Sequence, residues 1–331
     1  MPHSASPNRR QLLAGAAALT AAVPGLLRAA EPLAPDALKG RTVLITGASS
    51  GFGRIGALLY AKHGAKVIAT MRNTPRPEAD SLIAEAEKDK LDLHIVEIDV
   101  TDDASVASGT AAALKIAGGR IDTLVNNAGI GITGPVEVQD MEATRLIFET
   151  NVLGIQRMLR ALLPQMRAAK GGQIFNISSQ LGRVIVPGGG HYSATKFAVE
   201  ALSEQLAYEL VPHGIEVTII QPGGYPTRVW VNRNIYTGAL KGRSDADLLA
   251  AYEPFTRGMG TEDGSGRSAD PADVPRAIAE IMAMPAGTRP LRRAVHPGGK
   301  PQEAINKVSV EVQLAWLGGG QLGPLVRAVH D

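Results

Sequence analysis

The sequence lacks cysteine entirely, and its positive and negative charges nearly cancel. Without thiols there are no disulfides, no thiolate zinc site and no cysteine nucleophile, so an oxidising compartment poses no hazard to the chain. The formal net charge is +2 over 331 residues, and Lys and Arg are scattered along the chain. Nucleic acid is therefore not expected as the main partner, and no metal site is predicted.

The chain also lacks a long hydrophobic run. Its most apolar stretch, Leu12–Leu27, is short and interrupted by glycine, threonine and proline, which makes it a poor membrane span. The twin arginines Arg9 and Arg10 come just before this stretch. Together these features resemble a bacterial twin-arginine export signal, and we expect residues 1–30 to be a signal peptide.

The twin-arginine route carries proteins that are already folded, which would suit an enzyme that takes up its cofactor in the cytoplasm. We therefore expect a periplasmic protein that is cleaved near Ala29 or Ala30, with residues 31–40 as a linker. The alternative is a disordered or amphipathic N-terminal tail, in which case the protein stays in the cytoplasm.

From Arg41 onward, short β-branched runs alternate with longer helical patterns. Helix-sized intervals between apolar strands indicate right-handed crossovers and a parallel sheet that is covered on both faces. The predicted fold class is α/β, with a single Rossmann-like, doubly wound, mostly parallel seven-stranded sheet and helices on both faces. The expected strands are Thr42–Thr46, Lys66–Met71, Leu93–Ile98, Thr123–Asn126, Gln173–Ser178, Glu216–Gln221 and Leu291–His296.

One domain is expected to cover residues 41–300. The interval between its last two strands is long and contains many Gly, Ser and charged residues. This composition predicts a partly mobile insertion at about residues 224–270, followed by a helix at Pro271–Met284. Residues 301–331 are a C-terminal extension of unassigned role.

Tyr192 and Lys196 lie four residues apart at the start of a predicted helix, so their side chains share one face of it. A fixed ammonium beside a phenol favours the phenolate and brings its pKa from about 10 toward neutrality. A group that titrates near neutral pH suits proton transfer in catalysis. Such pairs are also common on solvated helix faces, so the pair alone leaves both interpretations open.

A glycine-rich turn, Thr46–Gly53, follows the first strand and precedes a helix. Glycines let the backbone approach a pyrophosphate closely, and the helix N-terminus offers free N–H groups and the positive end of the helix dipole. The spacing is Gly-x-x-x-Gly-x-Gly, which differs from the Gly-x-Gly-x-x-Gly of the standard fingerprint. Its place between strand and helix favours a dinucleotide site.

Arg72 and Asn73 follow the second strand, where an acidic residue would accept hydrogen bonds from the adenosine ribose and select NAD. An arginine here pairs instead with the 2′-phosphate of NADP. Ser49 and Asn73 offer further donors, and Arg76 offers a second cation. The alternative is a solvated surface arginine; we expect NADP(H) rather than NAD(H).

Taken together, these residues resemble the short-chain dehydrogenase/reductase family over most of residues 41–296. The turn is followed in order by the family's other motifs: Asp99-Val100 and Asn126-Asn127-Ala128-Gly129 at strand ends, Asn151 on a helix, Ser179 after the fifth strand, Tyr192 with Lys196, and Pro222-Gly223 with Thr227. Each motif is weak alone, but all of them occur in register.

The resemblance implies hydride transfer between a nicotinamide and a carbonyl or secondary-alcohol substrate, with Tyr192 exchanging the proton. It implies that Lys196 lowers the tyrosine pKa and holds the nicotinamide ribose. Ser179 then stabilises developing charge, and Asn151 holds a water that links Lys196 to solvent. The expected cofactor-binding residues are Gly47, Ser49, Ser50, Gly51, Phe52, Gly53, Arg72, Asn73, Asp99, Val100, Asn126, Ala128, Gly129, Tyr192, Lys196, Pro222, Gly223 and Thr227.

Ser178 is the alternative functional serine, but the spacing of thirteen residues between Ser179 and Tyr192 favours Ser179. A histidine at position 191 adjoins the site, and we expect it to be a surface residue that opens the helix. The aromatic residues of the insertion either line a substrate pocket or pack the insertion, and we expect packing; they are Tyr225, Trp230 and Tyr236.

Two features depart from the family pattern: the export signal, and the segment Val229–Asn234, which matches no substrate signature. A non-catalytic NADP-binding or redox-sensing module is the alternative function, although such a module has no need of all four catalytic residues. Sugar-nucleotide epimerisation or dehydration is disfavoured because the turn lacks a Gly-x-x-Gly-x-x-Gly spacing. Family members are commonly dimers or tetramers, so we expect a homo-oligomer. The helices around residues 144–167 and 194–210 are candidates for its interface; the alternative is that the chain's own sheet covers them.

Replacing Arg9 and Arg10 by lysine tests the export signal. We expect the double variant to remain in the cytoplasm, because the twin arginines are the residues that this export route reads. Cell fractionation followed by immunoblotting measures the distribution. An unchanged periplasmic fraction would refute the twin-arginine assignment.

Overall fold

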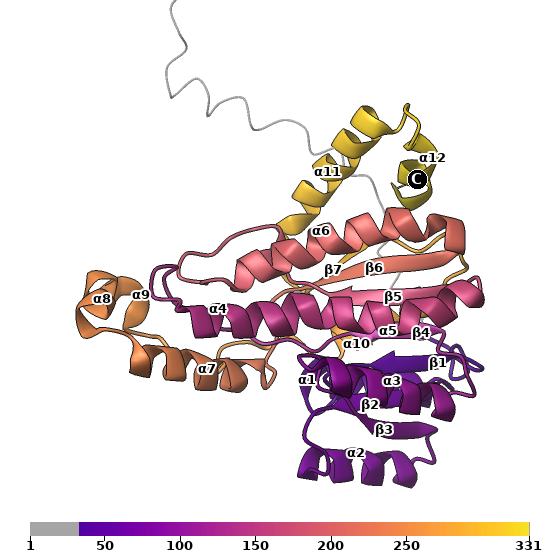
Figure 1. The fold of residues 1–331 in the computed structure, drawn as a ribbon, viewed down its shortest axis with the longest axis horizontal. Helices are drawn as coiled ribbons and strands as arrows, with labels where there is room; N and C mark the ends of the chain where they lie inside the picture. The colour runs from indigo at the N-terminus through magenta and orange to yellow at the C-terminus, as the bar shows by residue number, and fades with distance from the viewer. Residues whose placement is uncertain (1–32, 331) are drawn as a thin grey trace, which may run out of the picture. The chain divides into compact units, whose positions relative to one another are not determined.

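The computed structural model describes residues 33–330, so the predicted signal peptide lies outside the described residues. Seven strands form one sheet in the order β3-β2-β1-β4-β5-β6-β7 (Figure 1). Every strand pairing is parallel, so the predicted doubly wound sheet is confirmed and is wholly parallel. The strands are β1 (Thr42–Ile45), β2 (Lys66–Met71), β3 (Leu93–Glu97), β4 (Thr123–Asn126), β5 (Gly172–Ile177), β6 (Ile215–Pro222) and β7 (Arg292–Val295).

Helices connect successive strands and follow the last one. A π-helical turn, Glu149–Leu153, joins α4 to α5. The helices are α1 (Gly51–Lys62), α2 (Pro77–Lys88), α3 (Asp103–Ile116), α4 (Met141–Phe148), α5 (Gly154–Ala168), α6 (Tyr192–Leu210), α7 (Val229–Arg243), α8 (Ala246–Ala251), α9 (Glu253–Thr256), α10 (Asp273–Ala283), α11 (Gln302–Leu317) and α12 (Gly323–His330).

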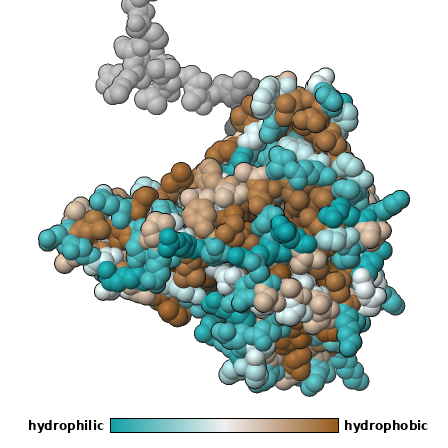
Figure 2. All heavy atoms as spheres, viewed as in Figure 1, coloured by the Kyte–Doolittle hydropathy of each residue, from teal (hydrophilic) through white to brown (hydrophobic). Residues whose placement is uncertain are grey.

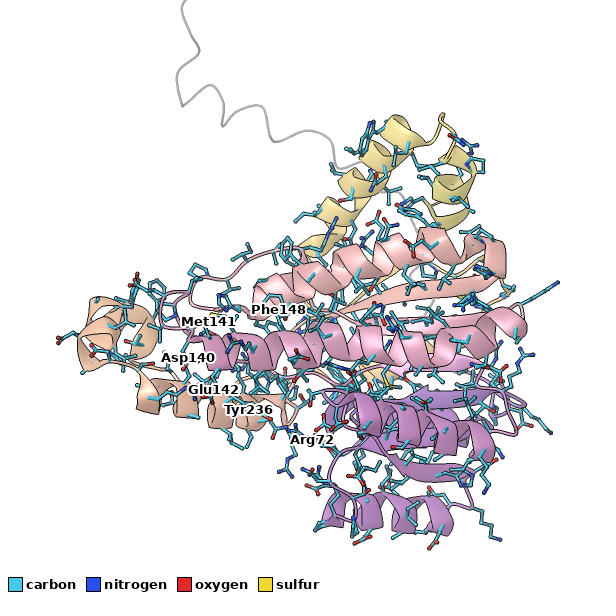
Figure 3. All side chains as sticks on the ribbon, in the orientation of Figure 1. Arg72, Asp140, Met141, Glu142, Phe148 and Tyr236 are labelled. Carbon is cyan, nitrogen blue, oxygen red and sulfur yellow. The ribbon has the colours of Figure 1, made fainter. Side chains whose placement is uncertain are left out.

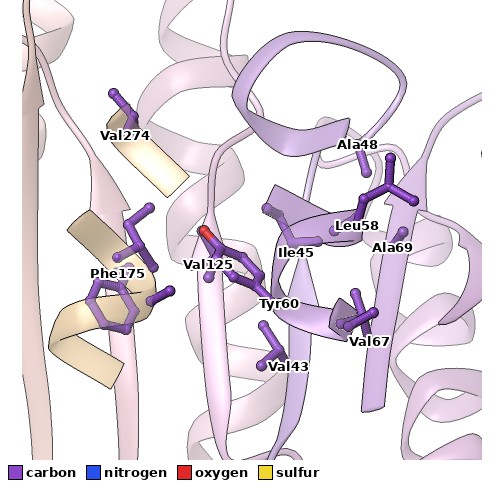
Figure 4. Close-up of a cluster of buried hydrophobic side chains, with 14 of the residues drawn as sticks. Val43, Ile45, Ala48, Leu58, Tyr60, Val67, Ala69, Val125, Phe175 and Val274 are labelled. Carbon is purple, nitrogen blue, oxygen red and sulfur yellow. The ribbon is translucent and has the colours of Figure 1, made fainter. Parts of the chain in front are cut away.

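Strand side chains alternate between two apolar cores, as the two-residue period of a strand requires. Val43 and Ile45 of β1 pack with buried residues of α1, α2 and α10, and Figure 4 shows part of this core. Leu44 points to the opposite face and packs with residues of α3, α5 and α6. The sheet is therefore covered on both faces, which explains why its strands are almost continuously apolar.

The strand order reverses between β1 and β4, because the chain first builds outward to β3 and then returns to the other side of β1. In parallel sheets a ligand binds outside the carboxyl ends of the strands at such a switch point. The Gly-rich turn follows β1, and the Asn-Asn-Ala-Gly motif follows β4. The topology thus brings the two motifs to the same place.

Residues 33–40, which were predicted to be part of a linker, belong to the folded domain. Leu38 is completely buried in the core around α1. Its backbone N–H donates to the carbonyl of His63 at the end of α1, at 2.9 Å. No pattern in the sequence indicated this burial, because a single leucine shortly after Pro32 and Pro35 has no periodic apolar partner.

The long segment between β6 and β7 is largely helical rather than an irregular insertion. Helices α7, α8 and α9 precede the predicted helix α10. Leu240 and Met259 of this segment are buried against Ile132 and Ile147, which form a third apolar cluster beside the sheet. Burial of these side chains attaches part of the segment to the rest of the domain.

The C-terminal extension forms helices α11 and α12, and α12 contacts α6. Within residues 33–330 no helix is long and apolar enough to cross a bilayer.

Candidate active site

The glycine-rich turn between β1 and α1 has a backbone that only glycine adopts easily. Gly47 and Gly51 have φ angles of +69° and +55°, in the left-handed region that disfavours a Cβ. A Cβ on Gly53 would lie 2.4 Å from the carbonyl oxygen of Gly47. The turn is therefore packed too closely for side chains, which leaves backbone N–H groups at the start of α1 facing the cavity.

Asn127, absent from the expected cofactor-binding residues, holds this turn in place. Its side-chain amide donates to the carbonyl oxygens of Thr46 at 2.8 Å and Gly47 at 3.2 Å. The Thr46 hydroxyl accepts in return from the backbone N–H groups of Asn127 and Ala128, both at 3.0 Å. The Asn-Asn repeat of the motif could have indicated this role, because Asn126 is the last residue of β4 and Asn127 is the first residue after it.

Asn126, the first asparagine of the motif, is buried inside the sheet. Its amide donates to the side-chain oxygen of Asn176 on β5 at 2.8 Å, and Asn176 donates to Ser203 on α6 at 2.8 Å. This chain of hydrogen bonds links β4, β5 and α6 directly below the catalytic residues. Asn126 does not line the cavity, so its contribution in this structure is to position other residues.

A cavity of about 790 Å³ opens at the carboxyl edge of the sheet. Of the expected cofactor-binding residues, Gly53, Asn73 and Asn126 do not line it. The others do: Gly47, Ser49, Ser50, Gly51, Phe52, Arg72, Asp99, Val100, Ala128, Gly129, Tyr192, Lys196, Pro222, Gly223 and Thr227. The residues that line the cavity extend from the turn before α1 to the first turn of α6.

Arg72 lines this cavity just after β2, beside Tyr236 of helix α7 (Figure 3). Its guanidinium donates to the Tyr236 hydroxyl at 2.8 Å and lies 4.0 Å from the carboxylate of Asp99. Arg76 also lines the cavity and donates to the carbonyl of Arg72 at 3.3 Å. Two cations, Arg72 and Arg76, therefore line the cavity next to the end of β2.

Asn73 does not line the cavity beside Arg72 and Arg76. Its φ angle is +58°, and its backbone N–H donates to the Glu97 carboxylate at 3.1 Å. An asparagine tolerates this left-handed conformation better than most residues. In this structure Asn73 turns the chain away from β2.

Tyr192 and Lys196 occupy the first turn of α6, at the end of the cavity away from Arg72. The Lys196 ammonium is buried and donates to the carbonyl of Ile177 at the end of β5, at 2.8 Å. It lies 5.7 Å from the centroid of the Tyr192 ring. The Ser179 hydroxyl lies beside the Tyr192 phenol and also accepts from the backbone N–H of Leu181 at 3.0 Å.

Burial dominates the protonation of this pair, in contrast to the expected lowering of the Tyr192 pKa. Burial raises the pKa of Tyr192, while the Ser179 hydroxyl and the Arg233 guanidinium oppose this shift. Burial also lowers the pKa of Lys196 to about 8, against the opposing charge of Glu200. Desolvation disfavours both charged forms, so the phenol keeps its proton at neutral pH.

Asn151 lies behind these residues, in the π-helical turn between α4 and α5, and is almost fully buried. Its side-chain oxygen accepts from the backbone N–H of Ile130 at 2.8 Å, and its amide donates to the Ile130 carbonyl at 2.9 Å. The amide also donates to the Thr195 hydroxyl at 3.1 Å. Asn151 does not line the cavity, and it clamps the loop after β4 to α6.

Ser178, the alternative serine, lines the same cavity as Ser179. Its hydroxyl is buried and has no hydrogen-bond partner within residues 33–330. The hydroxyl lies toward Gly182, because a Cβ on that glycine would come within 2.6 Å of it. Of the two serines, only Ser179 has its hydroxyl beside the phenol of Tyr192.

His191 packs against α4 rather than extending into solvent. Its ring nitrogen Nδ1 lies 3.0 Å from the Thr144 hydroxyl, and its ring meets that of Phe148 edge to face at 6.5 Å. His191 does not line the cavity.

The three aromatic residues of the insertion all line the cavity, in addition to packing the segment. Tyr225 is buried between the rings of Phe52 and His296, both at 5.4 Å. The guanidiniums of Arg233 and Arg267 lie over the Trp230 ring at 4.4 and 3.7 Å from its centroid. Tyr236 was expected only to pack the insertion; its hydrogen bond to Arg72 was not expected, because the two residues are far apart in the chain.

Comparison with known proteins agrees with this arrangement. The short chain dehydrogenase family model matches residues 41–236. A 3-ketodihydrosphingosine reductase from Bacteroides thetaiotaomicron is 36% identical over 255 residues, which cover 77% of this chain and 87% of the relative. Retinol dehydrogenase 8 from Homo sapiens is 38% identical over 284 residues, which cover 81% of this chain and 85% of the relative.

Solved structures extend the likeness to cofactor complexes. A short-chain dehydrogenase/reductase from Burkholderia phymatum in complex with NAD has a TM-score of 0.67 at 25% identity, covering 85% of this chain and 95% of that one. A metagenomic short-chain oxidoreductase in complex with NADP has a TM-score of 0.62 at 25% identity, covering 80% of this chain and 100% of that one. With its glycine turn and cavity, this chain is suited to a nicotinamide cofactor, and it belongs to the short-chain dehydrogenase/reductase family of oxidoreductases.

Proposed function

We propose that the protein transfers hydride between NADP(H) and a carbonyl or alcohol carbon, with Tyr192 exchanging the proton. The observation that carries this proposal is the convergence of Ser179, Tyr192 and Lys196 in the cavity that also contains the glycine turn. When bound, the nicotinamide supplies or accepts the hydride, and the protein supplies orientation and electrostatics.

In reduction, the Tyr192 phenol gives its proton to the carbonyl oxygen while the carbonyl carbon receives the hydride, so an alcohol results. The raised pKa of Tyr192 keeps that proton in place at neutral pH until substrate arrives. In oxidation the phenolate takes the alcohol proton, which requires the pKa of Tyr192 to fall. The Ser179 hydroxyl and the Arg233 guanidinium already act in that direction.

Lys196 and Asn151 have separate roles beside Tyr192, one electrostatic and one in positioning. With a pKa of about 8, the Lys196 ammonium is mostly charged at pH 7 and can hold the ribose next to the nicotinamide. Asn151 acts as a positioning residue, because its hydrogen bonds fix the loop after β4 relative to α6. The four residues expected to be catalytic thus have distinct roles, and only three of them line the cavity.

NADP(H) is the proposed cofactor because Arg72 and Arg76 line the adenosine end of the cavity. A guanidinium pairs strongly with phosphate oxygens. The Tyr236 hydroxyl holds the Arg72 guanidinium at 2.8 Å, which orients it before any ligand arrives. Relatives in complex with NAD and with NADP are both known, so the preference rests on these residues.

The proposed substrate carries a long apolar chain. Val186, Val229, Ile235 and Phe255 line the cavity, and each exposes more than a third of its surface. Exposed aliphatic and aromatic side chains at the mouth of a cavity offer apolar area, and covering that area with an apolar ligand is favourable. Relatives named for a ketosphingoid and for retinol act on molecules of this kind.

Tyr192→Phe tests the proton donor. We expect turnover with NADPH to fall by about 10²-fold or more, because a general acid contributes about this much, while NADPH still binds. The decrease in NADPH absorbance with time measures turnover, and quenching of tryptophan fluorescence on adding NADPH measures binding. Tyr252→Phe is the matched control, since its hydroxyl bonds to Glu137 outside the cavity. Near-native turnover of Tyr192→Phe would show that another group donates the proton.

Tyr236→Phe and Arg72→Ala test the 2′-phosphate assignment. We expect Arg72→Ala to raise the Kd for NADPH about tenfold to a hundredfold, since a hydrogen bond to a charged group contributes about 1.5–3 kcal/mol. Tyr236→Phe should give a smaller rise, because it frees the guanidinium without removing it. The Kd for NADH is the internal control and should stay nearly constant. Equal losses for the two cofactors would contradict the assignment.

A series of 2-alkanones of increasing chain length tests the apolar substrate. We expect kcat/KM to rise about fourfold for each added methylene, because burying one contributes about 0.8 kcal/mol. Ile235→Ser should weaken this rise, whereas Val231→Ser on the same helix should not, because Val231 does not line the cavity. A flat series in wild type would reject the apolar substrate while leaving the Tyr192 assignment intact.

A further inference from the structure

A cluster of three charged side chains forms part of the cavity wall. The guanidiniums of Arg233 on α7 and Arg267 each donate to the carboxylate of Glu262. All three residues line the cavity that also contains Tyr192. Two cations therefore share one carboxylate, and this Arg233–Glu262–Arg267 cluster has a net charge of +1.

Other carboxylates do not compensate the charge of the cluster at the cavity. Asp263 follows Glu262 in the chain, but it does not line the cavity, and its carboxylate accepts from the backbone N–H of Ser265 at 2.8 Å. Asp99 does line the cavity, and it lies 4.0 Å from the Arg72 guanidinium. Among the described residues that line the cavity, the excess positive charge of the cluster is thus left without a partner.

Both guanidiniums have hydrogen-bond donors left for a ligand. A guanidinium carries five N–H donors, and Arg233 and Arg267 each use only the Nη2 atom to bind Glu262. The Nε atom of Arg233 is buried and has no hydrogen-bond partner within residues 33–330. The exposed fractions of the two side chains are 16% and 27%. The guanidiniums are therefore partly desolvated, which strengthens their attraction for an anion.

Trp230 holds the two guanidiniums in fixed positions. They lie over its ring, at 4.4 Å and 3.7 Å from the centroid for Arg233 and Arg267. The indole N–H of Trp230 donates to the carbonyl of Tyr225 at 2.6 Å, which fixes the ring itself. A guanidinium that stacks on a ring through its face still has its edge available, and the edge is what binds a carboxylate.

The cluster lies near the residues that would exchange the proton. A Cβ on Gly131 would meet side-chain carbons of Arg233 at 3.1 Å, and a Cβ on Gly129 would lie 3.7 Å from the Lys196 ammonium. The two glycines are two residues apart, so their Cα atoms are separated by at most about 7 Å. A molecule whose carbonyl lies at Tyr192 can therefore place a second group at Arg233.

Apolar residues of the same helix accompany the cluster. Val229 and Ile235 of α7 line the cavity on either side of Arg233 in the chain. The face of helices α7–α9 in Figure 2 likewise mixes hydrophilic and hydrophobic side chains. A few convergent polar groups in an otherwise apolar pocket fix the orientation of a ligand. The cavity thus offers a cationic site for one end of a molecule and an apolar wall for the other.

We propose that Arg233 and Arg267 bind a carboxylate of the substrate, so that the substrate is an oxo or hydroxy acid with an apolar tail. The proposal rests on the proposed function, because it places the substrate carbonyl at Tyr192. Glu262 already shows that a carboxylate fits between the two guanidiniums, and one negative charge compensates the net charge of the cluster. The carboxylate exchanges neither hydride nor proton; it holds the carbonyl in position.

Calorimetric titration of the full chain with nonanoate and with 1-nonanol, in the presence of NADPH, tests the carboxylate site without turnover. We expect nonanoate to bind about tenfold to a hundredfold more tightly than 1-nonanol, the usual effect of a hydrogen bond to a charged group. Arg233→Met should remove most of this difference. Equal Kd values for the two ligands in wild type would overturn the proposal.

Two further variants accompany Arg233→Met. Arg257→Met is the matched control and should keep the preference of wild type, because Arg257 pairs with Glu253 and does not line the cavity. Arg233→Lys should give an intermediate Kd for nonanoate, since an ammonium lacks the two parallel donors of a guanidinium. The Kd for NADPH should stay nearly constant in Arg233→Met. A rise as large as that for nonanoate would assign Arg233 to a cofactor phosphate and overturn the proposal.

Glu262→Gln should have the opposite effect on nonanoate. The Glu262 carboxylate competes with the ligand for the same guanidiniums, so its neutralisation should lower the Kd for nonanoate while the Kd for 1-nonanol stays nearly constant. If Glu262→Gln and Arg233→Met weaken both ligands equally, the cluster only holds its segment in place and the proposal is overturned. Unchanged circular dichroism and thermal unfolding would show that the variants are folded.

Oxo acids and their methyl esters test the effect on the reaction. The acids 4-oxononanoate, 5-oxodecanoate and 6-oxoundecanoate share a pentyl tail and differ in the spacing between carbonyl and carboxylate. Wild type should have a higher kcat/KM for at least one acid than for its ester, and Arg233→Met should lower this ratio. A preference for the ester at every spacing would overturn the carboxylate site but not the reaction. Preferred binding of nonanoate without reduction of any acid or ester would instead refute the proposed reaction and support the site.

Discussion

The parallel pairing of all seven strands is the constraint on which the rest of the structure depends. Because every pairing is parallel, the carboxyl ends of the strands meet at one edge of the sheet. The turn after β1, the motif after β4, Ser179 after β5 and Pro222 at the end of β6 are therefore neighbours, although they span most of the chain. Buried hydrogen bonds from Asn126 through Asn176 to Ser203 fix these elements against one another.

Desolvation is the second general effect at this edge. The same burial that raises the pKa of Tyr192 lowers the pKa of Lys196, because the charged form is disfavoured in both cases. A tyrosine and a lysine at four-residue spacing predicted the opposite shift for the phenol, since spacing alone reports proximity and not solvent access. Tyr192 is therefore protonated at neutral pH, and the polar neighbour Ser179 reduces the free energy needed to ionise its phenol.

The Arg72–Tyr236 hydrogen bond connects two segments of the cavity wall that are far apart in the sequence, the end of β2 and helix α7. Arg72 follows β2, whereas Tyr236 belongs to α7, and both line the cavity. No local pattern joins residues so distant in the chain, so only the folded structure reveals Tyr236 as the partner of Arg72. The helical order of α7–α9 was likewise hidden, because it depends on burying Leu240 and Met259 against residues 100 positions earlier.

The sequence by itself determined the sheet, its strands within one or two residues, the family, and many of the residues that line the cavity. Each of these depends on local signals: the two-residue period of strands, the glycines of a turn, and motifs in fixed order. Tertiary structure alone decided what depends on solvent access and distant contacts. In the folded chain Leu38 is buried in the core, and Asn126 and Asn151 hold other residues in position through buried hydrogen bonds. Tyr236 forms a hydrogen bond with Arg72. Among residues 33–330 the tertiary structure also left Val308, Val312 and Trp316 of α11 exposed, because burial is a property of the packed chain and not of its residue order.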